Sequence, residues 1–143
     1  MIQIRRSALV RYSPAQMYEL VNDIPAYPKR FAWCAGAEVL TREEGVLTAR
    51  LDLGIAGIVQ SFTTRNALDP PNAIHMDFVS GPFRSLSGDW TFMALGDAGC
   101  KVGLALEFDY AGKLAAPALR LGFQGLADRM VDDFCREAAK AYG

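Results

Sequence analysis

The side chains that most often carry catalysis or bind metals are few in this sequence. His75 is the only histidine among 143 residues, and three cysteines, Cys34, Cys100 and Cys135, lie far apart. A structural zinc site needs four cysteine or histidine ligands, typically in closely spaced pairs. The sequence therefore predicts no metal centre. An odd number of widely spaced cysteines also favours reduced thiols over a disulfide framework.

Two further segments contain residue types found in phosphate-binding loops or acid/base sites, but their sequence surroundings do not match such sites. Gly54-Ile-Ala-Gly57 lacks the lysine and the strand-to-helix junction of a phosphate-binding loop, so it is interpreted as a turn or bulge. Near the C-terminus, acidic and basic residues alternate in a way that is typical of a solvated helix face. These residues are Asp128, Asp132, Asp133 and Glu137 with Arg129, Arg136 and Lys140. We therefore expect a protein that is not an enzyme and requires no cofactor.

Composition indicates one globular domain spanning residues 1–143. Hydrophobic residues make up 51% of the chain and charged residues 22%, and the net charge is -1. Such a charge gives no general attraction to phosphate, so a nucleic-acid partner would need a local patch, and no DNA partner is expected. The N-terminus has no long apolar run, which predicts neither a signal peptide nor a membrane span. We expect a cytoplasmic protein with at most peripheral membrane contact.

The elements that would position any site follow from hydrophobic periodicity. Residues 2–10 are predicted to form a strand, and Ser13-Pro14 is a helix start that leads into two short helices separated at Asn22-Asp23-Ile24-Pro25. From residue 37 the period changes to two, which predicts antiparallel strands. They lie around Val39 and around residues 47–53, 57–68, 72–79, 85–95 and 100–109. The fold class is therefore α+β, with the strands in a meander.

The last 25 or so residues have helical periodicity, and a helix of this length covers a sheet only if the sheet curls around it. The predicted apolar stripe consists of Ala118, Leu121, Gly122, Gly125, Leu126, Met130, Phe134 and Ala138. Small residues gather at the start of this helix, namely Ala115, Ala116, Ala118, Gly122 and Gly125. Two interpretations are open: the small residues leave room for a ligand, or they allow close packing of helix against sheet.

Alternation along the strands predicts which side chains face the helix. The inward set is Phe62, Ile74, Met76, Phe78, Leu86, Trp90, Phe92, Leu104, Leu106 and Phe108. Most of them are expected to be core. Gln60 and Thr64 fall on the same face as Phe62, and polar groups there need a partner, which is backbone, water or a ligand. His75 is out of phase with this set and is predicted to lie on the outer face.

Several short motifs, in this order, resemble one protein family. They are Val21-Asn-Asp-Ile24, Tyr27-Pro28, Trp33-Cys34, Ser61-Phe-Thr-Thr-Arg-Asn66, Gly81-Pro-Phe-Arg-Ser-Leu-Ser-Gly-Asp-Trp-Thr-Phe92, Met130-Val131 and Tyr142-Gly143. Together they resemble the coenzyme-Q-binding and polyketide-cyclase-like branch of the START superfamily. The resemblance implies a helix-grip (START/Bet v 1-like) fold: a curved antiparallel sheet of six to seven strands around a long C-terminal helix, with a hydrophobic tunnel. The chain departs from the family pattern at Lys29-Arg30-Phe31-Ala32 and at Leu106-Glu-Phe-Asp-Tyr110.

The resemblance directs attention to an apolar ligand site. Tyr27, Pro28, Phe31 and Trp33 lie on a short, proline-broken segment that is interpreted either as a lid for an isoprenoid tail or as a plug of the sheet's open end. Arg84 is either solvated in a turn or bound to a head group or an anionic partner. The candidate ligand-binding residues are Tyr27, Phe31, Trp33, Gln60, Phe62, Met76, Phe78, Phe83, Arg84, Trp90, Leu121 and Met130.

The resemblance to this family implies three alternative functions for the chain. The first is non-catalytic binding of an isoprenoid quinone, ubiquinone, in support of respiratory electron transport. The alternative is a ribosome-association toxin that binds the large ribosomal subunit and blocks subunit joining, through a patch such as Arg5, Arg6, Arg11, Lys29 and Arg30. The third is a polyketide cyclase-like enzyme that acts by orienting its substrate. The sequence has no acid/base pair to support the third.

Overall fold

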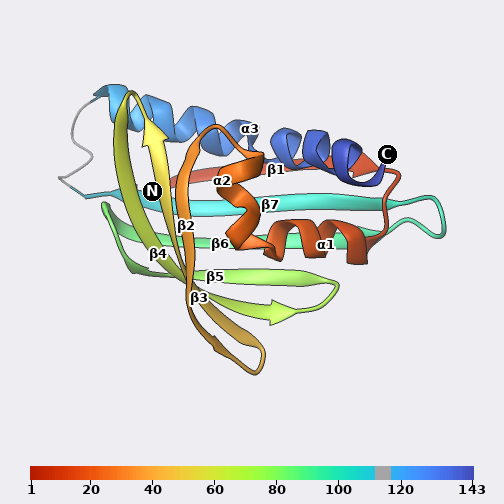
Figure 1. Ribbon diagram of the computed structural model, residues 1–143. Helices are drawn as coiled ribbons and strands as arrows, with labels where there is room; N and C mark the ends of the chain where they lie inside the picture. The colour runs from red at the N-terminus through yellow and green to blue at the C-terminus, as the bar shows by residue number, and fades with distance from the viewer. Residues whose placement is uncertain (112–116) are drawn as a thin grey trace.

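A computed structural model describes residues 1–111 and 117–143 of the chain (Figure 1). Within these residues, seven strands and three α-helices form the fold, with one short 3₁₀ helix, η1. The strands are β1 (Ile2–Val10), β2 (Cys34–Glu43), β3 (Val46–Ile55), β4 (Ile58–Asp69), β5 (Ala73–Ser80), β6 (Phe83–Ala94) and β7 (Cys100–Tyr110). The helices are α1 (Pro14–Asn22), η1 (Ile24–Ala26), α2 (Tyr27–Arg30) and α3 (Pro117–Tyr142).

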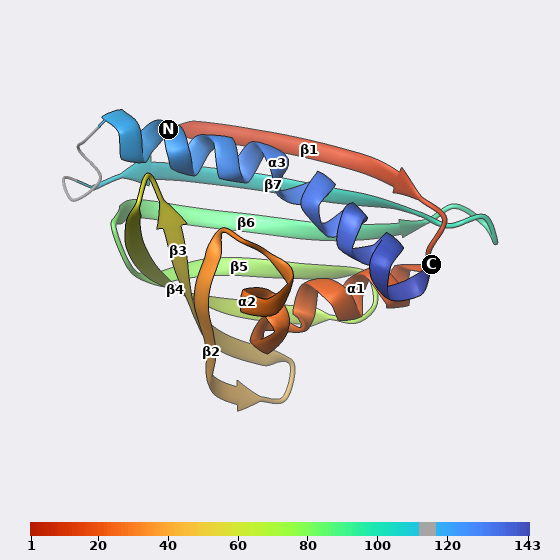
Figure 2. The ribbon, with the colours of Figure 1, turned by 45° about the horizontal axis from the view of Figure 1, so that its top comes forward.

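All seven strands belong to one antiparallel sheet, in the order β1-β7-β6-β5-β4-β3-β2. Strands β2 to β7 form a meander, and β1 returns to pair with β7. Figure 2 shows α3 lying along the face of β1 and β7, while β2 and β3 bend around the same side of the sheet. The predicted α+β helix-grip fold, with two short helices after the first strand, is therefore confirmed.

Local sequence signals account for the element boundaries that shape the site. The Ser13 hydroxyl accepts a hydrogen bond from the Gln16 backbone N–H, and the Gln16 side chain accepts one from the Ser13 N–H, so α1 begins with a capping box. Between β3 and β4, Ala56 and Gly57 both have positive φ, at 50° and 78°, as a two-residue hairpin turn requires. The interpretation of this segment as a turn rather than a phosphate loop is therefore confirmed.

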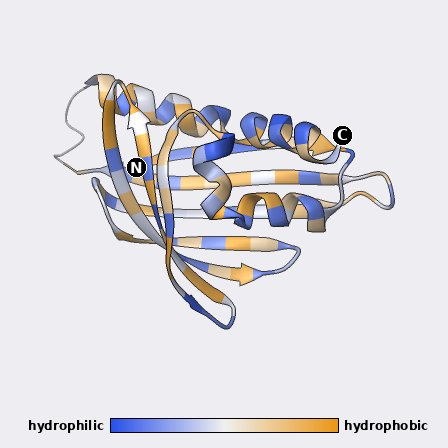
Figure 3. Ribbon diagram, in the orientation of Figure 1, coloured by the Kyte–Doolittle hydropathy of each residue, from blue (hydrophilic) through white to orange (hydrophobic). Residues whose placement is uncertain are grey.

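Hydropathy alternates along the strands (Figure 3), and the inward set predicted from that alternation is buried or half-buried throughout. Phe134 of α3 lies at the centre of the interior. Its ring contacts those of Tyr27, Phe31 and Trp90, with centroid distances of 5.4, 4.6 and 5.2 Å. Aromatic pairs at these distances add to the hydrophobic gain of burial. The short helix α2 and the long helix α3 are thus joined to the sheet through one aromatic cluster.

The buried face of α3 differs from the predicted stripe at two positions, Ala118 and Leu121, which are both exposed. The buried side chains include Leu119, Phe123, Leu126 and Phe134, whereas Leu121 is 72% exposed. Leu121 is two residues from both Leu119 and Phe123, a rotation of about 200° around the helix, so it lies on the opposite face. The prediction that Leu121 faces the interior is wrong.

Close packing accounts for one of the small residues at the start of α3. A Cβ placed on Gly122 would lie 2.4 Å from Ile55 Cγ2, so glycine allows the helix to approach the β3–β4 turn. At Gly125 nothing lies within 4 Å of such a Cβ. Ala115 and Ala116 lie outside the described residues. The interpretation as close helix-to-sheet packing therefore holds at Gly122, and open space remains at Gly125.

Candidate functional site: an interior cavity and a charged groove

The concave side of the sheet encloses a small interior cavity. It consists of two adjoining spaces of about 60 and 50 Å³, whose shared walls come from α2, β3, β4, β5 and β6. The residues that line both spaces are Tyr27, Leu51, Phe62, Met76 and Trp90. The first space is otherwise apolar and extends toward Phe123, Ala127 and Met130 of α3. The second extends toward the end of α1.

The structure brings together five of the predicted ligand-binding residues at this cavity: Tyr27, Phe62, Met76, Trp90 and Met130. Phe83 is buried beside it and makes ring contacts with Phe62 and Phe78 at 5.9 and 6.2 Å. Phe31 lies one layer further out, between the rings of Trp33 and Phe134. Whether these residues bind a ligand stays a prediction.

Seven of the twelve predicted residues do not line the cavity, and three of these lie away from the aromatic residues around it. Arg84 is exposed because Phe83, its neighbour on β6, takes the inward position in the alternation. Gln60 is half-buried near the open end of β4, where it pairs with Leu53. Leu121 lies on the outer face of α3, as described above. The structure therefore places no charged head-group ligand from this set inside the sheet.

The polar side chains of the cavity lie in its second space, near the end of α1. Thr64 and Asn66 are 6% and 5% exposed, and the Thr64 hydroxyl donates a hydrogen bond of 2.9 Å to Asn66 Oδ1. Asn22, the last residue of α1, lines the same space, and its buried Oδ1 has no hydrogen-bond partner in the described part of the chain. A buried acceptor without a donor is costly, so a water or a ligand donor would stabilise this end.

Sequence reasoning found Thr64 but missed its two neighbours. Asn66 shares the inward face of β4 with Phe62 and Thr64, so alternation alone was sufficient to find it. Asn22 gave no such signal, because a residue at a helix end is placed only by tertiary packing. Tyr27 is not a proton donor for a ligand in this space. Its hydroxyl donates a hydrogen bond to the Val21 carbonyl, and burial strongly raises the pKa of its phenol.

The size of the cavity limits what it holds in this conformation. Sites for drug-sized ligands typically enclose about 300–1,000 Å³, whereas one water needs about 10–15 Å³. Spaces of about 60 and 50 Å³ accommodate a few waters or a small group. A long isoprenoid tail requires the flexible side chains of Met76 and Met130, or the Tyr27–Trp33 segment, to move.

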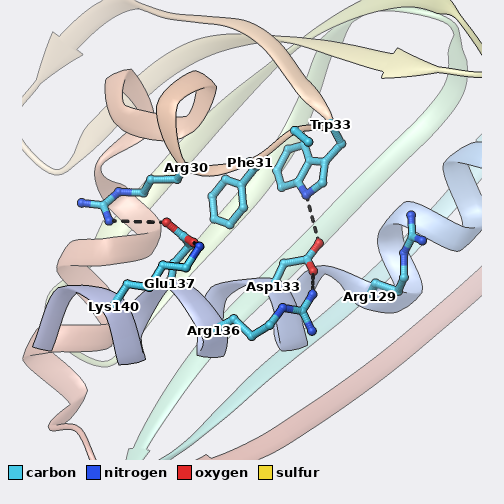
Figure 4. A pocket seen from close by; sticks show the side chains of 9 residues that line it. Arg30, Phe31, Trp33, Arg129, Asp133, Arg136, Glu137 and Lys140 are labelled. Carbon is cyan, nitrogen blue, oxygen red and sulfur yellow. Dashed lines mark hydrogen bonds and ion pairs between the residues drawn. The ribbon is translucent and has the colours of Figure 1, made fainter. Parts of the chain in front are cut away.

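A larger and chemically different hollow lies outside this cavity, between the α2–β2 connection and the C-terminal half of α3 (Figure 4). We call it the charged groove. Its volume is about 380 Å³, and it is lined by Arg30, Phe31, Ala32, Trp33, Arg129, Asp133, Arg136, Glu137 and Lys140. Four cationic side chains and two carboxylates thus face one hollow. Its floor is aromatic, because Phe31 and Trp33 stack with a centroid distance of 4.7 Å.

Two carboxylates of α3 organise the groove. Trp33 donates its indole N–H to Asp133 Oδ2 at 3.0 Å, and Arg136 forms an ion pair with the other oxygen of Asp133. Glu137 lies 3.1 Å from Lys140 Nζ and 4.0 Å from Arg30 Nη1. These contacts join α2 and the α2–β2 connection to α3 across the groove.

The solvated-face interpretation of α3 is therefore wrong for two of its acidic residues. Glu137 is only 8% exposed and Asp133 is half-buried, because the Arg30–Trp33 segment covers them. Asp132 is exposed as predicted, and Asp128 pairs with Arg6 of β1. The groove forms because the Arg30–Trp33 segment contacts this face of α3 from about 100 positions away in the sequence.

The basic residues proposed as a patch are divided by α3. Arg6 reaches Asp128 and Arg30 reaches Glu137. These two carboxylates are nine residues, or about two and a half turns, apart on α3, so they lie on opposite sides of the helix. Arg6 and Arg30 therefore flank α3 on different sides and do not form one continuous surface. The cations that meet Arg30 come instead from α3 itself.

The described residues form neither a metal-binding cluster nor a membrane-spanning helix. Among the described residues, no three His, Cys, Asp or Glu side chains lie close enough together to hold a metal ion. None of the helices in residues 1–111 and 117–143 is both long and apolar enough to cross a bilayer. Cys34, Cys100 and Cys135 are free thiols, and burial raises the pKa of each. Raised thiol pKa values make these cysteines poor nucleophiles.

Comparison with known proteins identifies the family to which this fold and cavity belong. Residues 10–135, most of the chain, match the family described as polyketide cyclase / dehydrase and lipid transport. The chain belongs to this family. The resemblance read from the sequence motifs is confirmed, and the apolar interior is the feature that the lipid-transport part of the family description leads one to expect.

Relatives of the chain carry two different names. A protein of Pseudomonas aeruginosa, named ribosome association toxin RatA, is 43% identical over 140 residues, which cover 98% of this chain and 97% of the relative. Coenzyme Q-binding protein COQ10 homolog B, mitochondrial, of Xenopus laevis is 25% identical, over 99% of this chain and 60% of the relative. Both names concern association or binding rather than a reaction.

A solved structure supports the fold assignment. The Zhui aromatase/cyclase of Streptomyces sp. R1128 superimposes with a TM-score of 0.84, over 97% of this chain and 94% of that chain. The sequence identity is 19%, so this likeness shows the helix-grip fold and nothing about a reaction.

Proposed function

We propose that this protein associates with the ribosome, binding the large subunit and hindering subunit joining, and that it does so without catalysis. The observation that carries the proposal is the 43% identity, over almost the whole of both chains, with the protein named ribosome association toxin RatA. The relative named for coenzyme Q binding is much more distant, at 25% identity. The proposal therefore follows the relative with the higher sequence identity.

The interior and the surface both support a binding function. The cavity walls are built from apolar side chains, amides, hydroxyls and one buried phenol, with no carboxylate, histidine or lysine among the described lining residues. A cyclase would have no general acid or base there. The small volume of the cavity also makes an isoprenoid quinone a poor fit in this conformation. The charged groove, by contrast, is open to a partner and already formed.

The experiment that tests the proposal is sedimentation of ribosomes with added protein. Purified protein is mixed with cell extract at low salt, and the gradient is analysed for 30S, 50S and 70S particles and for the protein itself. We expect the protein to travel with 50S particles, and the 70S peak to fall as the subunit peaks rise. A gradient unchanged by excess protein, with the protein remaining at the top, would rule the proposal out. Protein run without ribosomes is the control for self-association.

A second function, binding of a small amphipathic molecule, is favoured by one specific observation. The cavity has an apolar end and a polar end, and at the polar end Asn22 Oδ1 has no partner among the described residues while Asn66 and Thr64 are paired with each other. This arrangement suits a ligand with an apolar body and a hydrogen-bond donor in its head group. The distant relative named for coenzyme Q binding is consistent with an apolar ligand.

Native mass spectrometry of the protein purified from a ubiquinone-producing cell tests this second function. A stoichiometric adduct that lipid extraction identifies as a quinone or another amphipathic molecule would support it. The matched control is the Asn22→Leu variant, which should lose the adduct, because leucine fills the polar end and offers no acceptor. An unmodified mass that stays unchanged after addition of quinone and quinol would sink the ligand hypothesis, and would leave ribosome association untouched.

A further inference from the structure

The charged groove carries more positive than negative charge, and its carboxylates are already engaged. It contains four cationic side chains and two carboxylates. Asp133 takes hydrogen bonds from Trp33 and Arg136, and Glu137 lies between Lys140 and Arg30. The carboxylates therefore hold the cations in position and leave a net positive hollow on a protein whose overall net charge is -1. The excess is local, as a nucleic-acid contact on an acidic protein requires.

Some of the donor capacity in the groove has no partner. Arg129 is exposed and forms no ion pair or hydrogen bond in the described part of the structure. Its side chain extends into the groove apart from the paired residues (Figure 4). On the opposite wall, Nε of Arg30 is buried and also lacks a partner among residues 1–111 and 117–143. Arg129 thus presents unused N–H donors to the groove, whereas the unpaired Nε of Arg30 is buried and not accessible from it.

The cations of α3 form a line. Arg136 and Lys140 lie seven and eleven residues after Arg129. On a helix of 3.6 residues per turn, these separations are rotations of about -20° and +20° relative to Arg129. At a rise of 1.5 Å per residue, successive charges are spaced about 10 and 6 Å along the helix axis. A line of cations suits a polymer whose negative charge repeats along a strand, rather than a single small anion. Guanidinium groups also match the geometry of phosphate oxygens.

We propose that the charged groove docks the phosphate backbone of an RNA strand, with Arg129 making a direct phosphate contact. This inference rests on the proposed function, and it names ribosomal RNA, rather than a ribosomal protein, as the surface that the groove contacts. Arg136, Lys140 and Arg30 extend the contact along the strand. Asp133 and Glu137 are positioning residues, because they act on the cations and not on the RNA. The aromatic floor fixes the depth of the groove.

The test compares Arg129→Gln with Arg65→Gln by measuring affinity for purified 50S particles over a series of salt concentrations. Arg65 is also exposed, and it forms no ion pair or hydrogen bond within the described part of the chain. It lies on β4, whose inward positions are taken by Thr64 and Asn66, so its own side chain is on the outer face of the sheet. We expect Arg129→Gln to weaken binding about five- to tenfold near 100 mM salt, and to reduce the slope of log affinity against log salt by about 1. Arg65→Gln should match the wild type.

The possible outcomes separate the inference from the function on which it rests. Wild-type protein that fails to bind 50S particles contradicts the proposed function and the inference together. Wild-type binding with no difference between the two variants overturns only the groove. Weaker binding by Arg129→Gln with an unchanged salt slope indicates a protein partner and overturns the RNA contact. Equal thermal unfolding midpoints for the two variants show that any loss is not a loss of folding.

Discussion

The interior cavity and the charged groove lie on either side of the Tyr27–Trp33 segment, yet their linings differ in chemistry. The cavity walls are apolar, and the few polar groups are amides and hydroxyls. The groove holds six charged side chains within one hollow. Burial explains the difference, because an unpaired ion inside the sheet would lose its hydration. In the groove, Arg129, Arg136 and Lys140 are exposed, and the buried Glu137 is paired with Lys140. The molecule therefore has one apolar hollow and one charged hollow.

The same segment forms a wall of both sites. Tyr27 lines the cavity, Trp33 lines the groove, and Phe31 lies between them against Phe134 of α3. A movement of this segment that enlarges the cavity must also disturb the groove. The aromatic residues of Tyr27–Trp33 pack against the core, whereas the charged side chains outside them line the open groove. We therefore expect substitutions to lower stability strongly on the inner side and weakly on the outer side.

The largest effect is expected for Phe134→Ala. Phe134 is fully buried and contacts three aromatic rings, so its removal leaves a cavity and should lower the free energy of unfolding by about 3–5 kcal/mol. Leu121→Ala, on the exposed face of the same helix, is the matched control, and should change that free energy by less than about 0.5 kcal/mol. Urea unfolding measures both. Equal losses at the two positions would contradict the division of α3 into an inner and an outer face.

An intermediate effect is expected where the two regions meet, at the hydrogen bond from Trp33 to Asp133. A double-mutant cycle with Trp33→Phe and Asp133→Ala isolates this contact, since phenylalanine keeps an aromatic ring and removes the N–H. We expect a coupling free energy of about 1 kcal/mol, because the acceptor is charged but the bond is only partly buried. The control is a second cycle that combines Trp33→Phe with Asp132→Ala, at the exposed neighbour of Asp133. Its coupling free energy should be near zero. Coupling near zero in both cycles would mean that the bond does not join the segment to α3.

The cavity was largely predictable from the sequence, because its walls follow local periodicity. Alternation identified Phe62, Met76 and Trp90 as inward residues, and the order of the motifs indicated the helix-grip fold. Prediction was wrong at Leu121, where small residues beside it made the helical stripe look broader than it is. It missed Asn22 for a different reason, since the side chain of the last residue of α1 is placed by tertiary packing and not by helical periodicity.

The groove could not be predicted in the same way. Its two walls are Arg30–Trp33 and residues 129–140 of α3, about 100 positions apart, and no local pattern indicates that they meet. The alternating charges of α3 do suggest a solvated helix face, and for Asp132 that is correct. Burial of Asp133 and Glu137 depends on what packs over them. Sequence patterns give the face of a helix, but tertiary contact decides which part of that face becomes a site.

The smallest effect is expected from charges that lie outside both regions, at His75 on the outer face of β5. His75 Nδ1 lies 2.6 Å from Asp89 Oδ1 and Nε2 lies 3.1 Å from Asp77 Oδ1, and the hydrogen bond to Asp89 is the main cause that raises the pKa of His75 above 6.5. A raised pKa means that protonation favours the folded state, so this stabilisation is complete below pH 6.5 and is lost as pH rises through the folded-state value. His75→Gln should therefore lower the urea midpoint slightly at pH 5.5 and not at pH 9, and a difference between wild type and variant that persisted at pH 9 would show that the ion cluster is not its source.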